Sequence, residues 1–281
     1  MFTSPQELDL ELDRDELDRF IHEVRAKYSY DFANYAQSSF KRRVAMVLKK
    51  HGIKSLNYLT DRVLADAVFF DQVLLDITVN TTEMFRDPTF WKYLRLYVLP
   101  ELAKRPELAI WHAACSSGEE VLSMAILLKE EGLFDRARVY ATDINHKVLK
   151  RAADGRYAAR NLELFRTNYL ATGAKTQLEA YYQLQGGDPV FDRGLLERVN
   201  FRPHDLALDG SFGKFDLVFC RNVMIYFNQT LQNRVFELLH DSLFLGGFLA
   251  LGAKESLIWC RIADKFQTVS DHEKIYRKLR A

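Results

Sequence analysis

Hydrophobic residues in the first quarter of the chain recur at the three- and four-residue spacing of a helix. The pattern predicts four amphipathic helices within residues 14–78. An acidic first turn favours the start of the first helix. The second is expected from near Ser38 or Ser39 to Gly52, and Ser55 is placed to cap the third. Because each helix presents one apolar face, the four helices predict a small helical unit with its own core.

Beyond this unit, short apolar runs alternate with further helical patterns. Most of the runs have the length and residue types of buried strands, and the last alternates like a closing edge strand. In chain order they are Ile110–Ala113, Val139–Asp143, Val199–Arg202, Phe215–Cys220, Phe248–Leu251 and Lys274–Leu279. Helices are predicted over Phe90–Leu102 and Gln229–Leu245, the latter ended by Gly246-Gly247. Strands that alternate with helices predict an α/β fold with a doubly wound, mostly parallel sheet.

A long irregular stretch interrupts this alternation at about 156–197. It contains a helix-like segment near Lys175–Tyr182 and the turn signal Gly186-Gly187-Asp188-Pro189 between two short apolar runs. Because it exceeds an ordinary crossover in length, we interpret it as an insertion that carries a small β-hairpin. The predicted organisation is a helical domain over 1–78 with 1–13 disordered, a linker over 79–89 that contributes to a site, and an α/β domain over 90–281.

The first predicted strand runs into a turn of small residues and then directly into a helical pattern, in the sequence Ala113-Ala-Cys-Ser-Ser-Gly-Glu-Glu120. Such a junction directs the backbone N–H groups of a helix N-terminus toward a polar or anionic ligand beyond the strand. Asp143 ends the next predicted strand, where a carboxylate can reach ribose hydroxyls. Any βαβ unit with a serine-rich turn would give the same pattern, and the glycine-rich nucleotide fingerprint is absent because the turn holds only Gly118.

Polar residues also follow the predicted strand Phe215–Cys220. Arg221, Asn222 and Tyr226 lie at its carboxyl end, which is where open α/β sheets bind ligands. Since the carboxyl ends of parallel strands share one edge of a sheet, we expect these residues near Asp143.

The segment Asn80–Asp87 lies between two strongly apolar helices and is dense in hydrogen-bonding groups. One interpretation is a linker in which Asn80 or Thr82 caps the following helix. The other is that the segment lines a site from the helical side, with Arg86 as a fixed cation. The pattern alone does not decide between the two.

A basic stripe is predicted on the second helix, because Arg42 with Lys49 and Arg43 with Lys50 recur seven residues apart. The stripe is either a solvated helix face or a docking surface for an acidic partner. In the second case its association with the partner would be sensitive to salt.

The composition of the 281 residues argues against several classes of protein. A net charge of +1 gives no basic excess of the kind that nucleic-acid binding requires. Cys115, Cys220 and Cys260 lie far apart, without a cluster at metal-ligand spacing, which predicts reduced thiols in a cytosolic protein and no metal site. The acidic N-terminus lacks the pattern of a signal peptide. No apolar run approaches the roughly 20 residues that cross a bilayer.

Four of these segments occur together in one order. They are Asn80-Thr-Thr-Glu-Met-Phe-Arg86, Ala113-Ala-Cys-Ser-Ser-Gly-Glu-Glu120, Ala141-Thr-Asp143 and Phe219-Cys-Arg-Asn-Val-Met-Ile-Tyr-Phe227. In this order and spacing, the chain from about Asp15 to its end resembles the chemotaxis receptor methyltransferases of the CheR family. The resemblance implies the seven-stranded, Rossmann-like fold of class I methyltransferases. It also implies transfer of a methyl group from S-adenosyl-L-methionine (SAM) to receptor glutamates, which yields γ-glutamyl methyl esters and S-adenosyl-L-homocysteine (SAH).

The resemblance further implies roles for single residues. Arg86 and Tyr226 would lie next to the transferred methyl group, although Tyr226 is otherwise explained as a core aromatic residue with a satisfied hydroxyl. Asp143 would bind the ribose, and Asp205 would lie near the adenine unless it only caps a turn. The residues that would bind the cofactor are Asn80, Thr82, Arg86, Glu119, Asp143, Asp205, Leu206, Arg221 and Asn222.

Two segments depart from the family pattern or extend it. Gly252-Ala-Lys-Glu-Ser256 has Ala-Lys where the family usually has His-Ser, near the rim of the active site. The insertion at 156–197 corresponds to the family's small β-subdomain, which in some members binds a short peptide at the receptor's tail. The turn Gly186-Gly187 leaves open whether this chain binds such a peptide.

The implied reaction suits the residue types. A glutamate carboxylate is already ionised at neutral pH, so its methylation requires orientation in a dry pocket rather than a strong general base or a metal. The basic stripe would then dock an acidic receptor helix. We expect a cytoplasmic monomer, recruited to membrane receptor arrays, without nucleic-acid binding or membrane insertion. Two other functions stay open: methylation of a different acceptor, and a non-catalytic signalling module that binds SAM or SAH.

Overall fold

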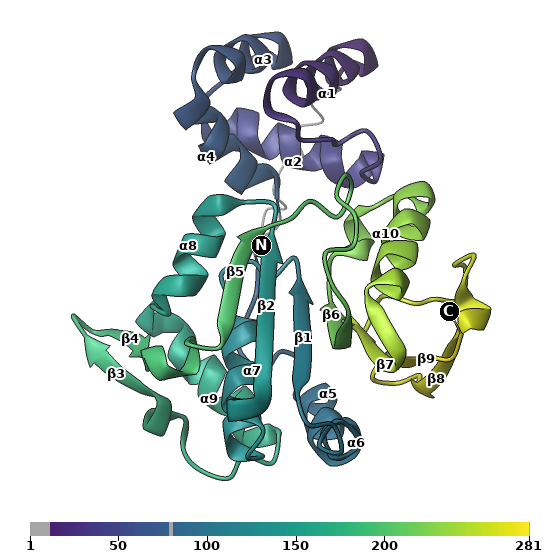
Figure 1. Ribbon diagram of the computed structural model, residues 1–281. Coiled ribbons are helices and arrows are strands. Elements are labelled where there is room, and N and C mark those ends of the chain that lie inside the picture. The colour runs from purple at the N-terminus through teal and green to yellow at the C-terminus, as the bar shows by residue number, and fades with distance from the viewer. Residues whose placement is uncertain (1–11, 79–80, 281) are drawn as a thin grey trace, which may run out of the picture. The chain divides into compact units, whose positions relative to one another are not determined.

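The computed structural model describes residues 12–78 and 81–280 (Figure 1). Expectations that concern residues 1–11 and Asn80 lie outside the described residues. Contacts between Cα atoms divide the chain into a helical unit and an α/β unit. The helical unit holds the chain up to Val79 together with Tyr226–Asn228, and the α/β unit holds Asn80–Ile225 and Gln229–Ala281.

Within residues 12–78 the structure has four helices, as the hydrophobic pattern predicts. They are α1 (Arg14–Tyr28), α2 (Gln37–Lys50), α3 (Leu56–Ala65) and α4 (Ala67–Ile77). Asp13, Ser55 and Asp66 cap α1, α3 and α4 by accepting hydrogen bonds from first-turn backbone N–H groups. The cap by Ser55, which accepts from the N–H of Tyr58 at 3.1 Å, confirms the prediction.

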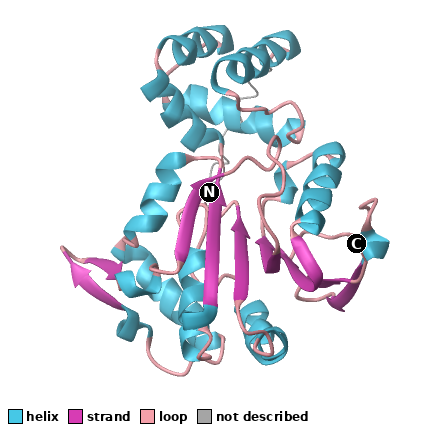
Figure 2. Cartoon of the chain, in the orientation of Figure 1, coloured by secondary structure: helices cyan, strands magenta, loops and turns pink. Residues whose placement is uncertain are grey.

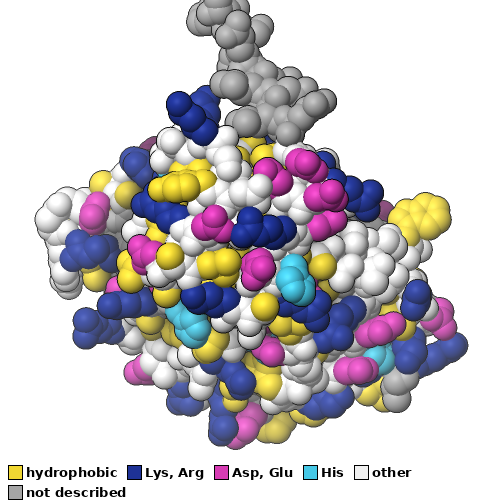
Figure 3. Space-filling view, turned by 90° about the horizontal axis from the view of Figure 1, so that it is seen from above, with side chains coloured by type: hydrophobic (Ala, Val, Ile, Leu, Met, Phe, Trp, Pro, Cys, Tyr) yellow, Lys and Arg dark blue, Asp and Glu magenta, His cyan; other side chains and the backbone are white. Residues whose placement is uncertain are grey.

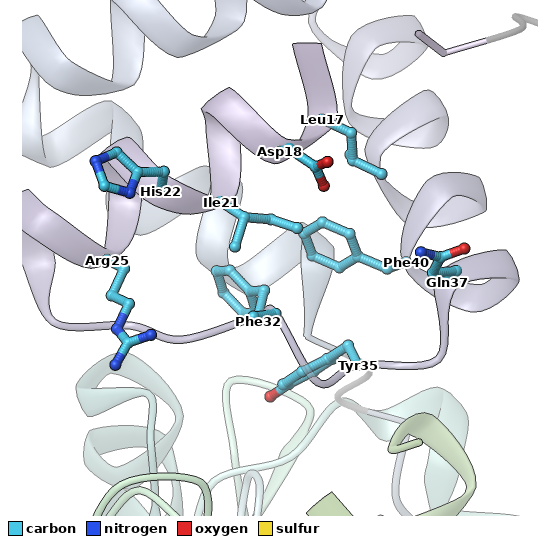
Figure 4. Close-up of a pocket in the computed structure, with 10 residues that line it drawn as sticks. Leu17, Asp18, Ile21, His22, Arg25, Phe32, Tyr35, Gln37 and Phe40 are labelled. Carbon is cyan, nitrogen blue, oxygen red and sulfur yellow. The ribbon is translucent and has the colours of Figure 1, made fainter. Parts of the chain in front are cut away.

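The apolar faces of these helices meet in a core of their own. Leu17, Phe20 and Val24 of α1 are at most 3% exposed in it. The ring of Tyr28 stacks on Phe70, with 3.9 Å between the ring centroids. A groove of about 260 Å³ hollows the surface beside α1, with an apolar floor and a polar rim (Figure 4). Its lining includes Leu17, Asp18, Ile21, His22, Arg25, Phe32, Tyr35, Gln37 and Phe40.

Among the described residues of the α/β unit, seven strands form one sheet in the order β5-β2-β1-β6-β7-β9-β8 (Figure 1). The strands are β1 (Leu108–Ala113), β2 (Ala137–Asp143), β5 (Val199–Pro203), β6 (Phe215–Cys220), β7 (Leu243–Leu251), β8 (Phe266–Ser270) and β9 (Ile275–Lys278). Neighbouring strands from β5 to β7 pair in parallel, and β9 is antiparallel to both of its neighbours. The predicted mostly parallel sheet is therefore confirmed.

One predicted strand is present but occupies a different position in the sheet. The segment Lys274–Leu279 was expected to close the sheet as its edge, but β9 lies between β7 and β8. The edge strand β8 has no counterpart among the predicted strands, because its sequence Phe-Gln-Thr-Val-Ser is largely polar and only its first residue is buried. An edge strand of this kind gives a weak hydrophobic signal.

Helices connect and flank the strands (Figure 2). They are α5 (Pro88–Tyr93), α6 (Leu99–Leu102), α7 (Glu119–Glu130), α8 (His146–Asp154), α9 (Leu162–Ala171) and α10 (Gln229–Asp241). A π-helical turn at Leu94–Val98 joins α5 to α6, so the helix predicted over Phe90–Leu102 is present. No helix within the described ranges is both long and apolar enough to cross a membrane.

The helix predicted over Gln229–Leu245 is too long. It ends at Asp241, and Leu243 already pairs with Phe215 of β6. The pair Gly246-Gly247 lies inside β7 rather than ending a helix. A Cβ atom on Gly247 would lie 3.1 Å from the carbonyl oxygen of Phe215, so this glycine permits the close approach of two strands.

The insertion carries the predicted hairpin. The strands β3 (Tyr182–Gln185) and β4 (Asp188–Phe191) pair antiparallel around Gly186 and Gly187, which have φ angles of +64° and +89°. The helix expected near Lys175–Tyr182 is wrong, because this stretch holds a 3-10 turn at Leu178–Tyr181. The insertion's α-helix is α9, which buries Phe165 and Tyr169 in the core.

Candidate functional site

The turn between β1 and α7 has an unusual backbone. Ala114, Ser116 and Gly118 have φ angles of +57°, +50° and +89°. A Cβ atom on Gly118 would lie 2.7 Å from the Cβ of Ala152 in α8, so only glycine fits where the two helices approach. The backbone N–H of Cys115 donates to the carbonyl of Thr142 at 2.8 Å, which joins the turn to the end of β2.

Asp143 ends β2 and organises this turn. Its carboxylate accepts hydrogen bonds from the backbone N–H groups of Ser116 and Asn145, each at 2.9 Å. The residue is 6% exposed, and burial raises the pKa of its carboxyl although the backbone N–H groups oppose the shift. The sequence therefore placed this carboxylate correctly at a strand end, next to the turn that starts α7.

Glu119 is the first residue of α7 and is 5% exposed. The hydroxyl of Ser117 donates to its carboxylate at 2.8 Å. Burial raises the pKa of Glu119 to about 7, and the hydrogen bond from Ser117 only partly opposes this. A carboxyl with this pKa changes its charge near neutral pH.

Two buried polar atoms beside Asp143 have no hydrogen-bond partner in the described part of the chain. They are the Ser116 Oγ and the Asn145 Nδ2, which belong to the same two residues whose backbones bind Asp143. A buried polar group without a partner costs about 1–3 kcal/mol, so such groups point to a polar ligand. A hydroxyl and an amide from residues next to the Asp143 carboxylate can bind polar groups of such a ligand.

The segment 81–87 is anchored through its backbone. The N–H of Phe85 donates to the Ser123 Oγ at 2.9 Å, and the carbonyl of Met84 accepts from the Asn168 Nδ2 at 3.0 Å. Phe85 is fully buried with a φ of +52°, a conformation that bulky residues rarely adopt. The Trp91 Nε1 donates to the carbonyl of Arg86 at 3.0 Å. The anchors on both sides fix the backbone that carries Arg86.

Arg86 and Thr82 are half-buried. The guanidinium of Arg86 lies 3.4 Å from the carbonyl oxygen of Thr81, which leaves most of its donors for other partners. The following helix, α5, begins at Pro88 with Asp87 in the cap position, so Thr82 does not cap it. The role of the segment as a wall of the site stays a prediction.

Arg221 is bound on all sides by protein groups. Its guanidinium contacts Glu120 at 3.2 Å and Asp87 at 2.7 Å, and lies 4.0 Å from the centre of the Phe90 ring. The side chain is 2% exposed. Burial acts to raise the pKa of Glu120, but His112 and Arg221 outweigh it and lower that pKa. Arg221 thus links the end of β6 to α7 and to the segment 81–87.

Asn222 follows Arg221 with a φ of +62° and is half-buried. Its backbone N–H donates to the Glu255 carboxylate at 2.9 Å. Sequence reasoning did not single out Glu255, although it lies in the segment Gly252–Ser256 that departs from the family pattern. Its buried carboxylate accepts from the loop after β6 as well as from the end of β7.

The remaining predicted residues differ in their surroundings. Asp205 caps a turn, since its Oδ1 accepts from the N–H of Ala207 at 2.7 Å. Leu206 is buried. Tyr226 groups with the helical unit, where its carbonyl accepts from the N–H of Ala36 at 2.8 Å. The roles of all three toward a cofactor stay predictions.

The predicted basic stripe on α2 is only partly free. Arg42 and Lys49 are exposed, whereas Lys50 pairs with Asp76 at 2.5 Å. The Arg43 Nε is buried without a partner among the described residues. On the face shown in Figure 3, basic and acidic side chains are interspersed. Within residues 12–78 and 81–280, no three His, Cys, Asp or Glu side chains gather as a metal site would require.

The strand order brings the site residues of the α/β unit together. The ends of β5, β2, β1 and β6 are neighbours, and the order reverses between β1 and β6. Open α/β sheets bind ligands at this reversal. Asp143, Glu119 and the loop after β6 all lie at these carboxyl ends.

Comparison with protein-family models matches both units. The model described as "CheR methyltransferase, SAM binding domain" matches residues 80–275. The model described as "CheR methyltransferase, all-alpha domain" matches residues 15–78. The two matches together span most of the chain.

Known relatives match the chain over most of its length. A Pseudomonas putida protein, Cher3, whose name describes a methyltransferase, is 42% identical over 263 residues, which are 94% of this chain and 96% of its own. A chemotaxis protein methyltransferase of Pseudomonas aeruginosa is 34% identical and covers 81% of this chain and 84% of its own. A chemotaxis protein methyltransferase of Listeria monocytogenes is 31% identical, and the match covers 85% of this chain and 89% of its own.

Proposed function

Because the chain belongs to the CheR methyltransferase family, we propose that it methylates glutamate side chains of chemoreceptors to γ-glutamyl methyl esters, with SAM as the methyl donor. Two observations at the strand ends carry the proposal: the buried carboxyl groups of Glu119 and Asp143, and the Ser116 Oγ and Asn145 Nδ2, which have no partner among the described residues. This arrangement supports a polar, nucleoside-like ligand at the reversal of strand order.

The bound donor would lie against the turn that starts α7. Asp143 would accept hydrogen bonds from ribose hydroxyls, while the Ser116 Oγ and Asn145 Nδ2 would gain the partners that they lack within the described part of the chain. Glu119 accepts from a further hydroxyl or amino group of the donor. SAM supplies a methyl group activated by its sulfonium. The proposed cofactor site would be completed by Asn80, Thr82, Arg86, Asp205, Leu206, Arg221 and Asn222.

The protein's own contribution to the reaction is orientation. The receptor carboxylate is ionised at neutral pH, so no residue needs to remove a proton from it. Arg86 and Tyr226 would orient the receptor carboxylate toward the methyl donor, with water excluded from the reacting groups. Arg86 must not bind the carboxylate so tightly that it lowers its nucleophilicity. Arg86→Ala should reduce kcat on a receptor fragment, and unchanged turnover would remove this role.

The receptor's acidic helices are the proposed partner of α2, through Arg42, Arg43, Lys49 and Lys50. The hairpin β3–β4 is the proposed place for a receptor tail peptide. Both interactions would occur in the cytoplasm, at the receptor arrays, with the protein acting as a monomer. None of them requires nucleic acid or insertion into a membrane.

Calorimetric titration with SAM and with SAH tests the cofactor site first. We expect stoichiometric binding by the parent protein and none by Asp143→Ala. A matched control is Asp154→Ala, which removes an exposed carboxylate at the end of α8 and should leave binding unchanged. Absence of binding by the parent protein would contradict the proposal.

The acceptor is tested with radiolabelled SAM and a soluble receptor fragment. Glutamyl methyl esters release methanol in mild base, whereas N-methyl products and ordinary ethers do not. Base-labile label on the receptor fragment supports the proposal. Base-stable label would indicate a different acceptor, and binding of SAM without transfer to any receptor fragment would indicate a non-catalytic module.

A further inference from the structure

Glu255 lies in the loop after β7, outside every segment assigned above to the methyl donor. Glu255 is 4% exposed, and its carboxylate accepts four backbone hydrogen bonds. Oε1 accepts from the N–H groups of Val223 and Met224, each at 2.7 Å. Oε2 accepts from those of Asn222 at 2.9 Å and Gly252 at 2.6 Å. The four donors use the acceptor positions of an ionised carboxylate.

These bonds join the ends of two neighbouring strands. Asn222, Val223 and Met224 follow β6, and Gly252 follows β7. A Cβ atom on Gly252 would lie 2.8 Å from the Glu255 Oε2 and 2.7 Å from the Asn222 Nδ2. The glycine is therefore needed for the side chain of Glu255 and the loop after β6 to approach this closely.

The loop after β6 has a conformation that requires such support. The φ of +62° at Asn222 lies in the left-handed region, which asparagine adopts at a smaller cost than most other residues and which the surroundings here hold in place. On one side of Asn222, Arg221 is fixed by Glu120 and Asp87. On the other side, Glu255 holds the next two N–H groups. Asn222 is thus fixed between two buried anchors.

We propose that Glu255 is a positioning residue that holds Asn222 in the conformation that binds the methyl donor, without touching the donor itself. This rests on the proposed function. The substitution Glu255→Gln tests it, because the amide keeps the shape but replaces one acceptor oxygen with an N–H donor. That donor faces two backbone N–H groups, which lose their acceptor.

A matched control is available on β6, the strand that the Asn222 loop follows. Asp216 of β6 is also 4% exposed, and its carboxylate accepts from the N–H of Ala109 at 2.8 Å and pairs with Arg105. It lies near the opposite end of β6 from Asn222. Asp216→Asn therefore disturbs a buried carboxylate in the same sheet but away from the site.

Two measurements on the folded proteins separate positioning from general stability. In Glu255→Gln, amide hydrogen exchange in a peptide over 221–226 should become about tenfold faster, and the Kd for SAH should rise at least about tenfold. In Asp216→Asn the thermal midpoint should fall, whereas both of these quantities should stay within about twofold of the parent values. Glu255→Asp keeps the charge but is too short to span both loops, and should change both quantities in the same direction.

The outcomes are distinct. Equal SAH affinity in Glu255→Gln and the parent protein would overturn the positioning role, and so would an equal loss of affinity in Asp216→Asn. If Glu255→Gln does not fold, Glu255→Asp decides by the same criteria. No SAH binding by the parent protein would overturn the proposed function and this role with it. The exchange of peptide 221–226 would then still report whether Glu255 holds the loop.

Discussion

Three carboxyl groups near the start of α7 differ in what surrounds them. Glu119 receives a hydroxyl hydrogen bond, Asp143 receives two from backbone N–H groups, and Glu120 is paired with His112 and Arg221. Burial acts on all three, but only at Glu120 do the partner side chains, His112 and Arg221, outweigh it. The pKa is therefore raised in two of them and lowered in the third.

Glu119→Gln should change how stability depends on pH. The pKa of Glu119 is about 7 in the folded protein against 4.5 as its ordinary value. This carboxyl therefore stabilises the fold below about pH 4.5 and loses that contribution as the pH rises through 7. Glutamine does not ionise. Between pH 5 and pH 8 the free energy of unfolding of the variant should therefore rise relative to that of the parent, by up to about 3 kcal/mol. Urea unfolding at several pH values measures this difference.

The control for this prediction is Glu163→Gln, which changes an exposed glutamate of α9. This variant should leave the free energy of unfolding within about 0.5 kcal/mol of the parent value. A difference between Glu119→Gln and the parent that is constant from pH 5 to pH 8 would show that Glu119 does not titrate in this range.

Gly118→Ala should destabilise the α/β unit strongly. The new Cβ would lie 2.7 Å from the Cβ of Ala152. The alanine would also have to adopt the φ of +89° that Gly118 has. Gly132, just after α7, provides the comparison, because its φ is +68° and a Cβ there meets nothing within 4 Å. Gly132→Ala should cost about 1–2 kcal/mol for the backbone alone, and Gly118→Ala about 2 kcal/mol more for the clash. Similar losses of unfolding free energy in the two variants would contradict the close approach of Gly118 to Ala152.

At the scale of elements, the sequence was most informative where one segment determines its own structure. Ser55 caps α3, and the hairpin turns at Gly186-Gly187, because both depend on local backbone chemistry. The position of Asp143 at a strand end follows from a local apolar run. The family resemblance is confirmed by both family models.

Features that depend on two distant segments were missed. Glu255 gives little local signal, because three of its four partners are backbone N–H groups about thirty residues away in the chain. Gly246-Gly247 looks like a helix stop until Phe215 is placed beside it. The ion pairs of Arg221 with Glu120 and Asp87 join segments far apart in the chain and gave no sequence signal, while its role at the cofactor stays a prediction. A one-dimensional pattern indicates that such residues are special without indicating what they contact.

Ser123→Ala should weaken the attachment of the segment 81–87 to α7. The Ser123 hydroxyl donates to the carbonyl of Glu119 at 2.7 Å and accepts from the N–H of Phe85 at 2.9 Å. Without the hydroxyl, the buried N–H of Phe85 would have no acceptor from Ser123. This should lower the free energy of unfolding by about 2 kcal/mol, as measured by urea denaturation.

Ser242→Ala is the matched control, since Ser242 is also fully buried and donates to a carbonyl four residues earlier. Its other contact, the Ser211 hydroxyl, lies on an exposed residue that can bind water instead. The control should cost less than about 1 kcal/mol. Equal costs would mean that the bond to Phe85 contributes little.

At the scale of the whole molecule, the net charge of +1 gives no general attraction to an acidic partner. Any electrostatic docking must come from a local arrangement of charges. On α2, Arg42 and Lys49 are exposed, and Met46 between them is 54% exposed. Lys50 is already paired with Asp76. The proposed docking surface therefore depends chiefly on Arg42 and Lys49.

Arg42→Glu should raise the KM for a receptor fragment about threefold to tenfold with little change in kcat, because it alters docking and not the reacting groups. Added NaCl should raise the parent's KM and have less effect on the variant, since salt screens exposed charges beyond about 8 Å at physiological ionic strength. Lys92→Glu, an equal change of charge at an exposed position of α5, is the control and should leave KM unchanged. If both variants raise KM equally, net charge rather than the face of α2 governs the encounter. If neither variant does, the receptor binds through another surface, and the exposed charges of α2 only solvate the helix.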